Sequence, residues 1–185
     1  MITVELSDGH GLTNSVTAWI PALRQFFARA RRAVPVAGRV SVLLASDKEI
    51  RKLNREFRGK NKATDVLSFP ALIIAENNSP GKRATRSGPS PQKVLAGDLA
   101  ISLDTAARQA EQFGHPLFIE LKILLLHGLL HLAGHDHETD GGEMAEREEQ
   151  LRRRFRLPHA LIARSGQHEI KEHSSARPPK PGGRR

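Results

Sequence analysis

Three histidines in the second half of the chain have the spacing of a metal site. They are His127, His131 and His137, in the segment HGLLHLAGHDH. His127 and His131 are four residues apart, so on a helix both imidazoles project from one face and can reach one ion. Burying them in so apolar a stretch without a partner would be costly. The pattern therefore predicts one zinc-type ion held by the three histidines.

Gly134 predicts how the third histidine reaches the same ion. Glycine accepts the left-handed backbone that ends a helix, so we expect the helix to end near Gly134 and the chain to turn back. That turn brings His137 toward the first two histidines. Three neutral imidazoles leave the fourth tetrahedral position open, which is typical of a catalytic zinc site. The alternative is a set of core or surface histidines that binds no ion.

Two other residues of this turn have roles that the sequence leaves open. Asp136 is either a hydrogen-bond acceptor that orients a ligand imidazole or an ordinary turn aspartate. His135 is expected to support the site or to face solvent, and not to serve as a fourth ligand.

The histidine spacing also matches the H-E-x-x-H-x-x-G-x-x-H pattern of the metzincin peptidases. In those enzymes the glutamate after the first histidine is the general base that activates the attacking water. Gly128 occupies that position here. The sequence therefore disfavours peptide hydrolysis.

Residues 47–62 form a basic segment with a second functional pattern. Its arginines recur at the spacing of one helix face: Arg51, Arg55 and Arg58. The opposite side carries the residues expected in the core: Ile50, Leu53 and Phe57. The forked guanidinium of arginine suits phosphate binding. With Lys60 and Lys62, this face is predicted to follow an RNA backbone, and an ordinary solvated helix face is the alternative.

The elements that must position these residues follow from hydrophobic periodicity. Strands are expected at residues 2–6, 39–44, 64–74 and 94–103. Helices are expected after capping residues at 13–15, after a cap at Ser46 or Asp47, after a cap at Asp104 and on to about residue 113, at 117–133 and at 142–155. This pattern predicts an α+β fold, with a small mixed four-stranded sheet, about five helices, and the zinc site on the central helix and the following turn. The strand order is not fixed by the sequence.

The length of 185 residues fits one domain with additional loops and tails. We expect this domain to span residues 1–163. Residues 76–93 are rich in Pro, Gly, Ser and Asn without apolar periodicity, which predicts a mobile basic loop. Residues 164–185 end in PPKPGGRR and are expected to be a disordered basic tail.

Composition narrows the class of protein. Cysteine is absent, which excludes disulfides and thiolate metal ligands. The net charge of +9 favours a polyanionic partner such as RNA. No apolar run approaches the ~20 residues that cross a membrane, so no membrane association is expected. The first residues do not resemble a secretory signal, and a cytoplasmic location is expected.

Four segments together resemble the YbeY family of bacterial rRNA-maturation factors, which are metal-dependent single-strand endoribonucleases. The segments are NREFRGK at 54–60, KATDVLSFP at 62–70, GDL at 97–99 and HGLLHLAGHDH at 127–137. The resemblance covers roughly residues 1–155 apart from the loop at 76–93. The glycine after the first motif histidine, joined to TDVLSFP, makes it highly specific. The loop and the tail are departures from the family pattern.

The resemblance implies an α+β fold that holds one Zn2+ ion per chain through His127, His131 and His137. It also implies a functional arginine, Arg58, that acts in RNA cleavage. The implied role is maturation of the 16S rRNA 3′ end and ribosome quality control. The implied partners are single-stranded RNA, the small ribosomal subunit and its associated proteins.

Two other functions remain open from the sequence. One is a ribosome-assembly factor without catalytic activity, in which zinc stabilises the turn around Gly134. The other is a metallohydrolase of peptides or amides, against which Gly128 argues.

Overall fold

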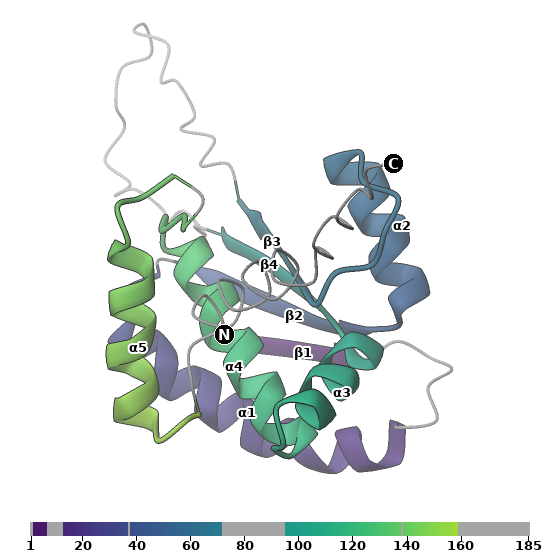
Figure 1. Cartoon of the computed structure of the whole chain (residues 1–185), viewed down its shortest axis with the longest axis horizontal. Helices are drawn as coiled ribbons and strands as arrows, with labels where there is room; N and C mark the ends of the chain where they lie inside the picture. Colours follow the sequence, from purple (N-terminus) through teal and green to yellow (C-terminus); the bar gives the residue numbers. More distant parts are fainter. Residues whose placement is uncertain (1, 7–12, 37, 72–94, 138, 159–185) are drawn as a thin grey trace, which may run out of the picture.

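The computed structural model describes residues 2–6, 13–36, 38–71, 95–137 and 139–158 (Figure 1). Within these residues nine elements follow one another: β1 (Ile2–Leu6), α1 (Thr13–Ala33), β2 (Arg39–Ala45), α2 (Asp47–Arg58), β3 (Val66–Pro70), β4 (Leu95–Ser102), α3 (Leu103–Gln112), α4 (Leu117–Leu132) and α5 (Glu143–Phe155). The predicted loop at 76–93, the tail at 164–185 and the domain boundary at 163 lie outside the described residues.

The four strands form one mixed sheet in the order β1-β2-β4-β3. β1, β2 and β4 run parallel, and β3 joins the edge antiparallel to β4. The predicted α+β class with a small four-stranded sheet is therefore confirmed. The register of β2 against β4 shifts between Arg39 and Val40, opposite the interval from Leu95 to Gly97.

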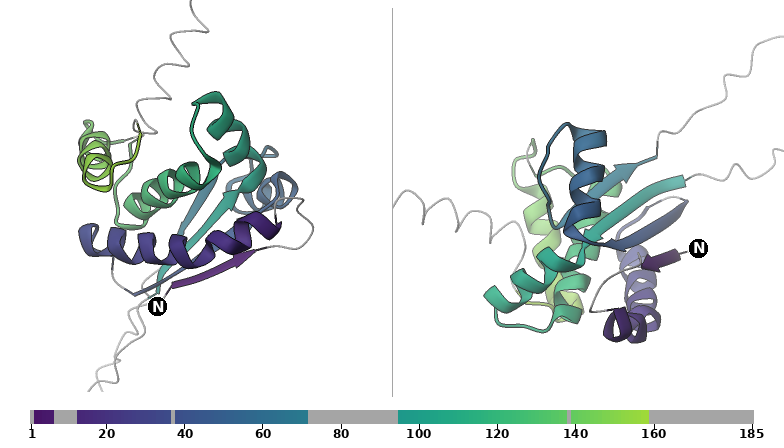
Figure 2. Two further views of the ribbon diagram at one scale, coloured as in Figure 1. Left: turned by 90° about the horizontal axis from the view of Figure 1, so that it is seen from below. Right: turned by 90° about the vertical axis from the view of Figure 1, so that its right-hand side faces the viewer.

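Alternating residues of the strands face two different layers of helices. Val40, Val42 and Leu44 of β2 are buried in the main core with residues of α1 and α4. Ala100 and Leu67 point the other way and pack against residues of α2. Accordingly α1 and α4 cover one face of the sheet, whereas α2 lies on the other (Figure 2).

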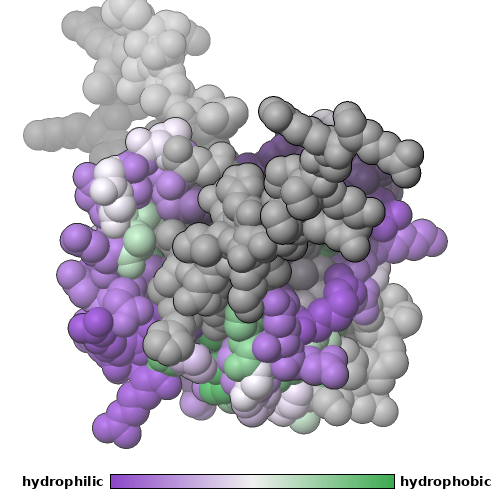
Figure 3. Space-filling model, viewed as in Figure 1, coloured by the Kyte–Doolittle hydropathy of each residue, from purple (hydrophilic) through white to green (hydrophobic). Residues whose placement is uncertain are grey.

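α4 is apolar all round because other elements enclose it. It contacts α1, α3, α5 and the sheet, and residues 123–130 are all buried. Within the described residues no single helix is long and apolar enough to span a membrane, and the pair of α3 and α4 that reaches this length is bent by 113°. α5 closes the outer side of the core and presents a hydrophilic surface (Figure 3).

Side chains cap the starts of α2 and α3, and one of the predicted caps is wrong. Ser46 caps α2 in a capping box with Glu49. The expectation that Asp104 caps α3 is wrong, because Ser102 accepts the hydrogen bond from the backbone N–H of Thr105. The carboxylate of Asp104 instead accepts from the backbone N–H of Asp47, at 2.8 Å, and ties the starts of α2 and α3 together.

Candidate metal centre

The turn after α4 forms as the glycine pattern predicts. Gly134 has φ +91°, and its N–H bonds to the carbonyl of His131 at 3.0 Å. The next N–H, of His135, reaches back to the carbonyl of Leu130 at 3.1 Å. This pair of bonds is a Schellman motif, which reverses the chain directly after the helix. The reversal brings His137 next to the helix histidines.

The structure brings His127, His131 and His137 together. One potential ligand atom from each lies within 4.8 Å of the other two, so the group could hold a metal ion. The ring of His137 lies 5.3 Å from that of His127 and 5.2 Å from that of His131, measured between centroids. His127 is 5% exposed, whereas the other two are half-buried. One side of the cluster is therefore closed by protein and the other opens outward.

Hydrogen-bond acceptors behind the rings determine which nitrogens face inward. The Nδ1 atom of His127 lies 3.3 Å from a carboxylate oxygen of Glu148, and that of His131 lies 3.0 Å from the carbonyl oxygen of His135. Both oxygens accept, so each Nδ1 carries the proton and each Nε2 has a free lone pair.

Those two Nε2 atoms face each other at 3.1 Å. Two lone pairs at this distance repel unless they share a cation. Two nitrogen ligands of tetrahedral zinc stand about 3.3 Å apart, given zinc–nitrogen distances of about 2.0–2.1 Å. In addition, Nδ1 of His137 is buried and has no hydrogen-bond partner among the described residues. The donor set therefore fits a zinc-type ion.

The pKa of His131 is lowered from 6.5 to about 4. Burial is the largest cause, followed by the neighbouring His127 and His137, while the carbonyl of His135 and the charge of Asp136 act in the opposite direction. His131 is therefore neutral at pH 7, the state that a metal ligand requires.

Sequence reasoning missed a residue behind the cluster. Glu148 of α5 is fully buried between His127 and Arg152, whose guanidinium lies 3.3 Å from its second carboxylate oxygen. Arg152, 1% exposed, also donates to the carbonyl of Pro158, with Nε at 2.6 Å. The available signal was an acidic residue on the same helix face as the buried Met144 and Leu151.

Asp136, the predicted support residue, is exposed on the turn. Its carboxylate accepts a hydrogen bond from the Thr139 hydroxyl at 3.0 Å, and its charge raises the pKa of His131. Its proposed role in orienting a ligand stays a prediction. His135 lies outside the three-histidine group, and its backbone carbonyl orients His131.

Gly128 faces the sheet, where α4 packs closely on β4. A Cβ atom at Gly128 would lie 2.8 Å from Cδ2 of Leu99 and 3.4 Å from the Ser68 hydroxyl. A glutamate at this position has no room beside Leu99. The absence of the metzincin general base is thus linked to the close packing of helix on sheet.

The basic residues of α2 and the loop after it are all exposed: Arg51, Arg55, Arg58, Lys60 and Lys62. None of them forms an ion pair with another residue that the structure describes. Arg58 is the last residue of α2, and Gly59 caps the helix with φ +69°. The predicted charged face is therefore available to a polyanion.

The expectation that Phe57 faces the core is wrong. Its side chain is 61% exposed, while Ile50 is fully buried. The Phe57 ring contacts Phe69 of β3 edge to face, with centroids 5.2 Å apart. The last turn of α2 stands over a hollow in the sheet surface, so the ring is covered on one side alone.

The candidate metal centre and the basic helix lie on opposite faces of the sheet. In Figure 1 the histidine-bearing end of α4 and the last turn of α2 both lie toward the upper edge of the molecule, with β3 between them in this view.

The fold and the cluster define a class of α+β protein in which a core helix and its following turn present three histidines to one candidate metal position. The chain belongs to the YbeY family: the family model described as Endoribonuclease YbeY matches residues 5–156.

Individual relatives agree with this assignment. The chain is 49% identical over 144 residues to Endoribonuclease YbeY of Koribacter versatilis, covering 78% of this chain and 82% of the relative. It is 44% identical over 126 residues to Endoribonuclease YbeY of Nautilia profundicola, covering 68% and 78%. The solution structure of TM1509 from Thermotoga maritima matches with a TM-score of 0.50 and 27% identity, covering 81% of this chain and 85% of that one.

Proposed function

We propose that this protein is a zinc-dependent, single-strand-specific endoribonuclease. The observation that carries the proposal is the convergence of three imidazoles, two of them oriented from behind by hydrogen-bond acceptors, in a chain whose relatives are named Endoribonuclease YbeY. We further propose that it acts in the cytoplasm on the 3′ end of 16S rRNA and in ribosome quality control, with the small ribosomal subunit and its associated proteins as partners.

In this proposal His127, His131 and His137 hold the ion. Glu148 and the carbonyl of His135 keep the two helix imidazoles in the tautomer that binds metal. When bound, zinc supplies Lewis-acid stabilisation of charge on a phosphoryl oxygen. The half-buried side of the cluster, at His131 and His137, is where substrate enters.

Arg58 binds the phosphate at the scissile bond and stabilises the charge that grows on its oxygens during cleavage. The other exposed cations, Arg51, Arg55, Lys60 and Lys62, bind neighbouring phosphates along the strand. Because α2 and α4 lie on opposite faces of the sheet, the strand bends around β3, and the scissile phosphate lies at this edge, between Arg58 and the open side of the histidine cluster.

The test combines metal analysis with RNA cleavage. The purified full chain is assayed for zinc by elemental analysis, and on matched single-stranded and double-stranded RNA with and without a chelator. We expect about one zinc per chain, and cleavage of the single strand that the chelator abolishes. His137→Ala should lose zinc and cleavage together. His135→Ala, in the same turn but outside the cluster, should retain both.

Two results would contradict the proposal. If the fully zinc-loaded chain leaves single-stranded rRNA intact while His127→Ala still blocks ribosome maturation in cells, the protein is a non-catalytic assembly factor. If the chain cleaves a peptide or amide library and leaves RNA intact, it is a different metallohydrolase.

A further inference from the structure

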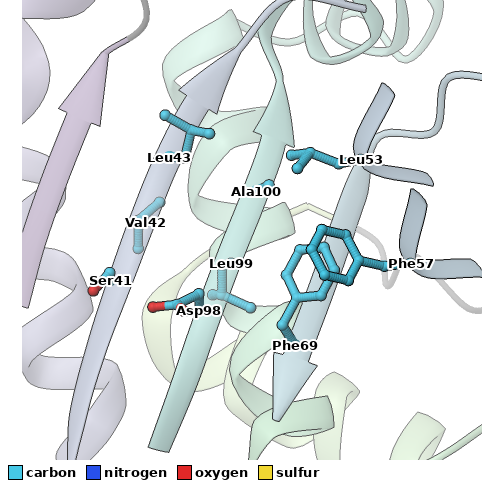
Figure 4. A pocket seen from close by; sticks show the side chains of 9 residues that line it. All are labelled: Ser41, Val42, Leu43, Leu53, Phe57, Phe69, Asp98, Leu99 and Ala100. Atoms are coloured by element: carbon cyan, nitrogen blue, oxygen red, sulfur yellow. The ribbon is translucent and has the colours of Figure 1, made fainter. Parts of the chain in front are cut away.

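A hollow of about 380 Å³ opens on the sheet face that carries α2. It is on the opposite face from the candidate metal centre, and none of the three histidines lines it. Its floor is Ala100 of β4, whose small side chain leaves a depression between larger neighbours (Figure 4). A volume of this size lies within the range of small-molecule sites and exceeds that of one nucleobase.

Aromatic and aliphatic side chains form the walls. The rings of Phe57 and Phe69 lie together on one side, and Leu43 and Leu53 lie at one end (Figure 4). Phe57 keeps 61% of its surface exposed, although it is a large apolar side chain. An exposed aromatic ring beside an apolar hollow is a surface on which a planar, partly apolar ligand can stack.

Polar residues that accept hydrogen bonds also line the hollow. Asp98 lies beside Phe69, its register partner on the neighbouring strand, and Ser41 lies beyond Asp98 on β2 (Figure 4). The Asp98 carboxylate is exposed and forms no ion pair with another residue that the structure describes. A planar ligand stacked on Phe57 therefore meets an acceptor with two oxygens at one of its edges.

Charge beside the hollow indicates a polyanionic ligand. The helix that contributes Leu53 and Phe57 also carries Arg51, Arg55 and Arg58 on its exposed surface. A phosphate backbone that leaves the hollow over the end of α2 would meet Arg58, which follows Phe57 in the chain. A single-stranded RNA offers both kinds of group: a planar base for the hollow and a phosphate backbone for α2.

We propose that this hollow binds one unpaired base of the RNA substrate and that it prefers guanine; this inference rests on the ribonuclease function proposed above. The base stacks on Phe57, and its Watson–Crick edge faces Asp98. Guanine is the RNA base that presents two adjacent donors, N1–H and the amino group, on that edge, so one carboxylate can accept from both. Uracil places carbonyl oxygens on both sides of its single donor, and these repel the carboxylate.

Fluorescence anisotropy of the zinc-loaded full chain tests this. The probes are labelled eight-nucleotide uridine RNAs that carry a central guanosine, a central adenosine or no substitution, with probe integrity checked on a denaturing gel. We expect the guanosine probe to bind about tenfold tighter than the all-uridine probe, a discrimination at the lower end for a bidentate contact.

The variants separate stacking from base recognition. Phe57→Ala should weaken guanosine-probe binding about five- to tenfold, whereas Phe57→Tyr, which keeps the ring, should bind like the unaltered chain. Asp98→Asn should reduce the guanosine preference to less than twofold without loss of all-uridine binding. Gln25→Ala, an exposed neutral substitution on α1, is the matched control and should change nothing.

The two proposals fail in different ways. If the unaltered chain binds and cleaves RNA but Phe57→Ala and Asp98→Asn bind all three probes as it does, the base site is overturned and the ribonuclease function stands. If Phe57→Ala weakens binding while no probe is preferred, the guanine preference is overturned. Failure of the unaltered chain to bind any probe would overturn both.

Discussion

At the scale of single residues, the candidate metal centre depends on the hydrogen-bond acceptors behind two of its three imidazoles. Glu148 and the carbonyl of His135 fix the tautomers of His127 and His131, and thereby point both Nε2 atoms at one position. Arg152 in turn holds Glu148, so the arrangement extends from the ligand to the end of α5.

Replacing Glu148 with glutamine should weaken zinc affinity about 10- to 100-fold, because the neutral amide polarises the imidazole of His127 less than a carboxylate does. The measurement is competition for zinc against a chromophoric chelator. Glu149→Gln is the control, since Glu149 pairs with Arg153 on the partly exposed side of α5. Equal affinities for the two variants would show that Glu148 has no role in metal binding.

Replacing Arg58 with alanine should lower single-turnover RNA cleavage by roughly 100-fold or more and leave zinc content unchanged, because its loss removes charge stabilisation at the phosphate and touches no ligand. Arg58→Lys should recover part of the rate, since lysine keeps the charge without the fork. Parallel loss of zinc and activity would instead indicate that Arg58 supports the fold.

At the scale of elements, two close approaches position the site. The first is at Gly128, where α4 lies directly against β4. The second is at Gly97, whose lack of a side chain lets the end of α4 approach β3 and β4. A Cβ atom at Gly97 would collide with the carbonyl oxygen of Phe69 and lie 2.8 Å from Cδ2 of Leu132. Since Leu132 directly follows His131, this contact determines how closely the histidine-bearing end of α4 approaches the sheet.

Gly97→Ala should therefore lower the free energy of unfolding by at least about 2 kcal/mol, from overpacking added to an unfavourable φ of +132°. Gly59→Ala provides the comparison, because Gly59 also has positive φ but has nothing within 4 Å of an added Cβ. Gly59→Ala should lower the free energy of unfolding by about 1 kcal/mol, from the unfavourable backbone conformation alone. Chemical denaturation followed by circular dichroism measures both, and equal costs would contradict the close packing.

At the scale of the whole molecule, the sheet separates the two candidate functional surfaces. The three histidines belong to the face covered by α1 and α4, whereas the basic helix and the hollow belong to the face of α2. β3, at the sheet edge, contacts α4 and carries Phe69 into the hollow. The geometry of the candidate metal site depends on the stability of the fold, because two of its histidines project from the central core helix and the third from the turn that follows it.

This coupling predicts a pH dependence for the metal-free chain. The pKa of His131 is about 4 in the fold against 6.5 as the ordinary value, so between these pH values the unfolded chain binds a proton that the folded chain does not. The contribution to stability is therefore complete above pH 6.5 and decreases as the pH falls toward 4.

Thermal unfolding in excess chelator, from pH 7.5 to pH 4, measures this effect. The melting temperature should fall with pH, and it should fall less steeply for His131→Gln, which has no proton to take up. The same slope in both proteins would show that His131 does not carry this pH dependence.

Much of the candidate site was predictable because its determinants are local. The four-residue spacing of His127 and His131, the turn at Gly134 and the extent of α4 depend on neighbouring residues and on helical period. The alternating strands and the arginine face of α2 followed from the same kind of pattern. These features are properties of short stretches of chain, and the structure retains them.

Tertiary structure decided three features that the sequence did not predict: the strand order, the position of Glu148 behind His127, and the exposure of Phe57. Glu148 is 21 residues from His127 in sequence, and its position depends on how α5 packs on α4. Phe57 has the helical position of a core residue, yet Ala100 beneath it leaves a hollow. Such features depend on which elements meet across the fold, and a local pattern does not contain that information.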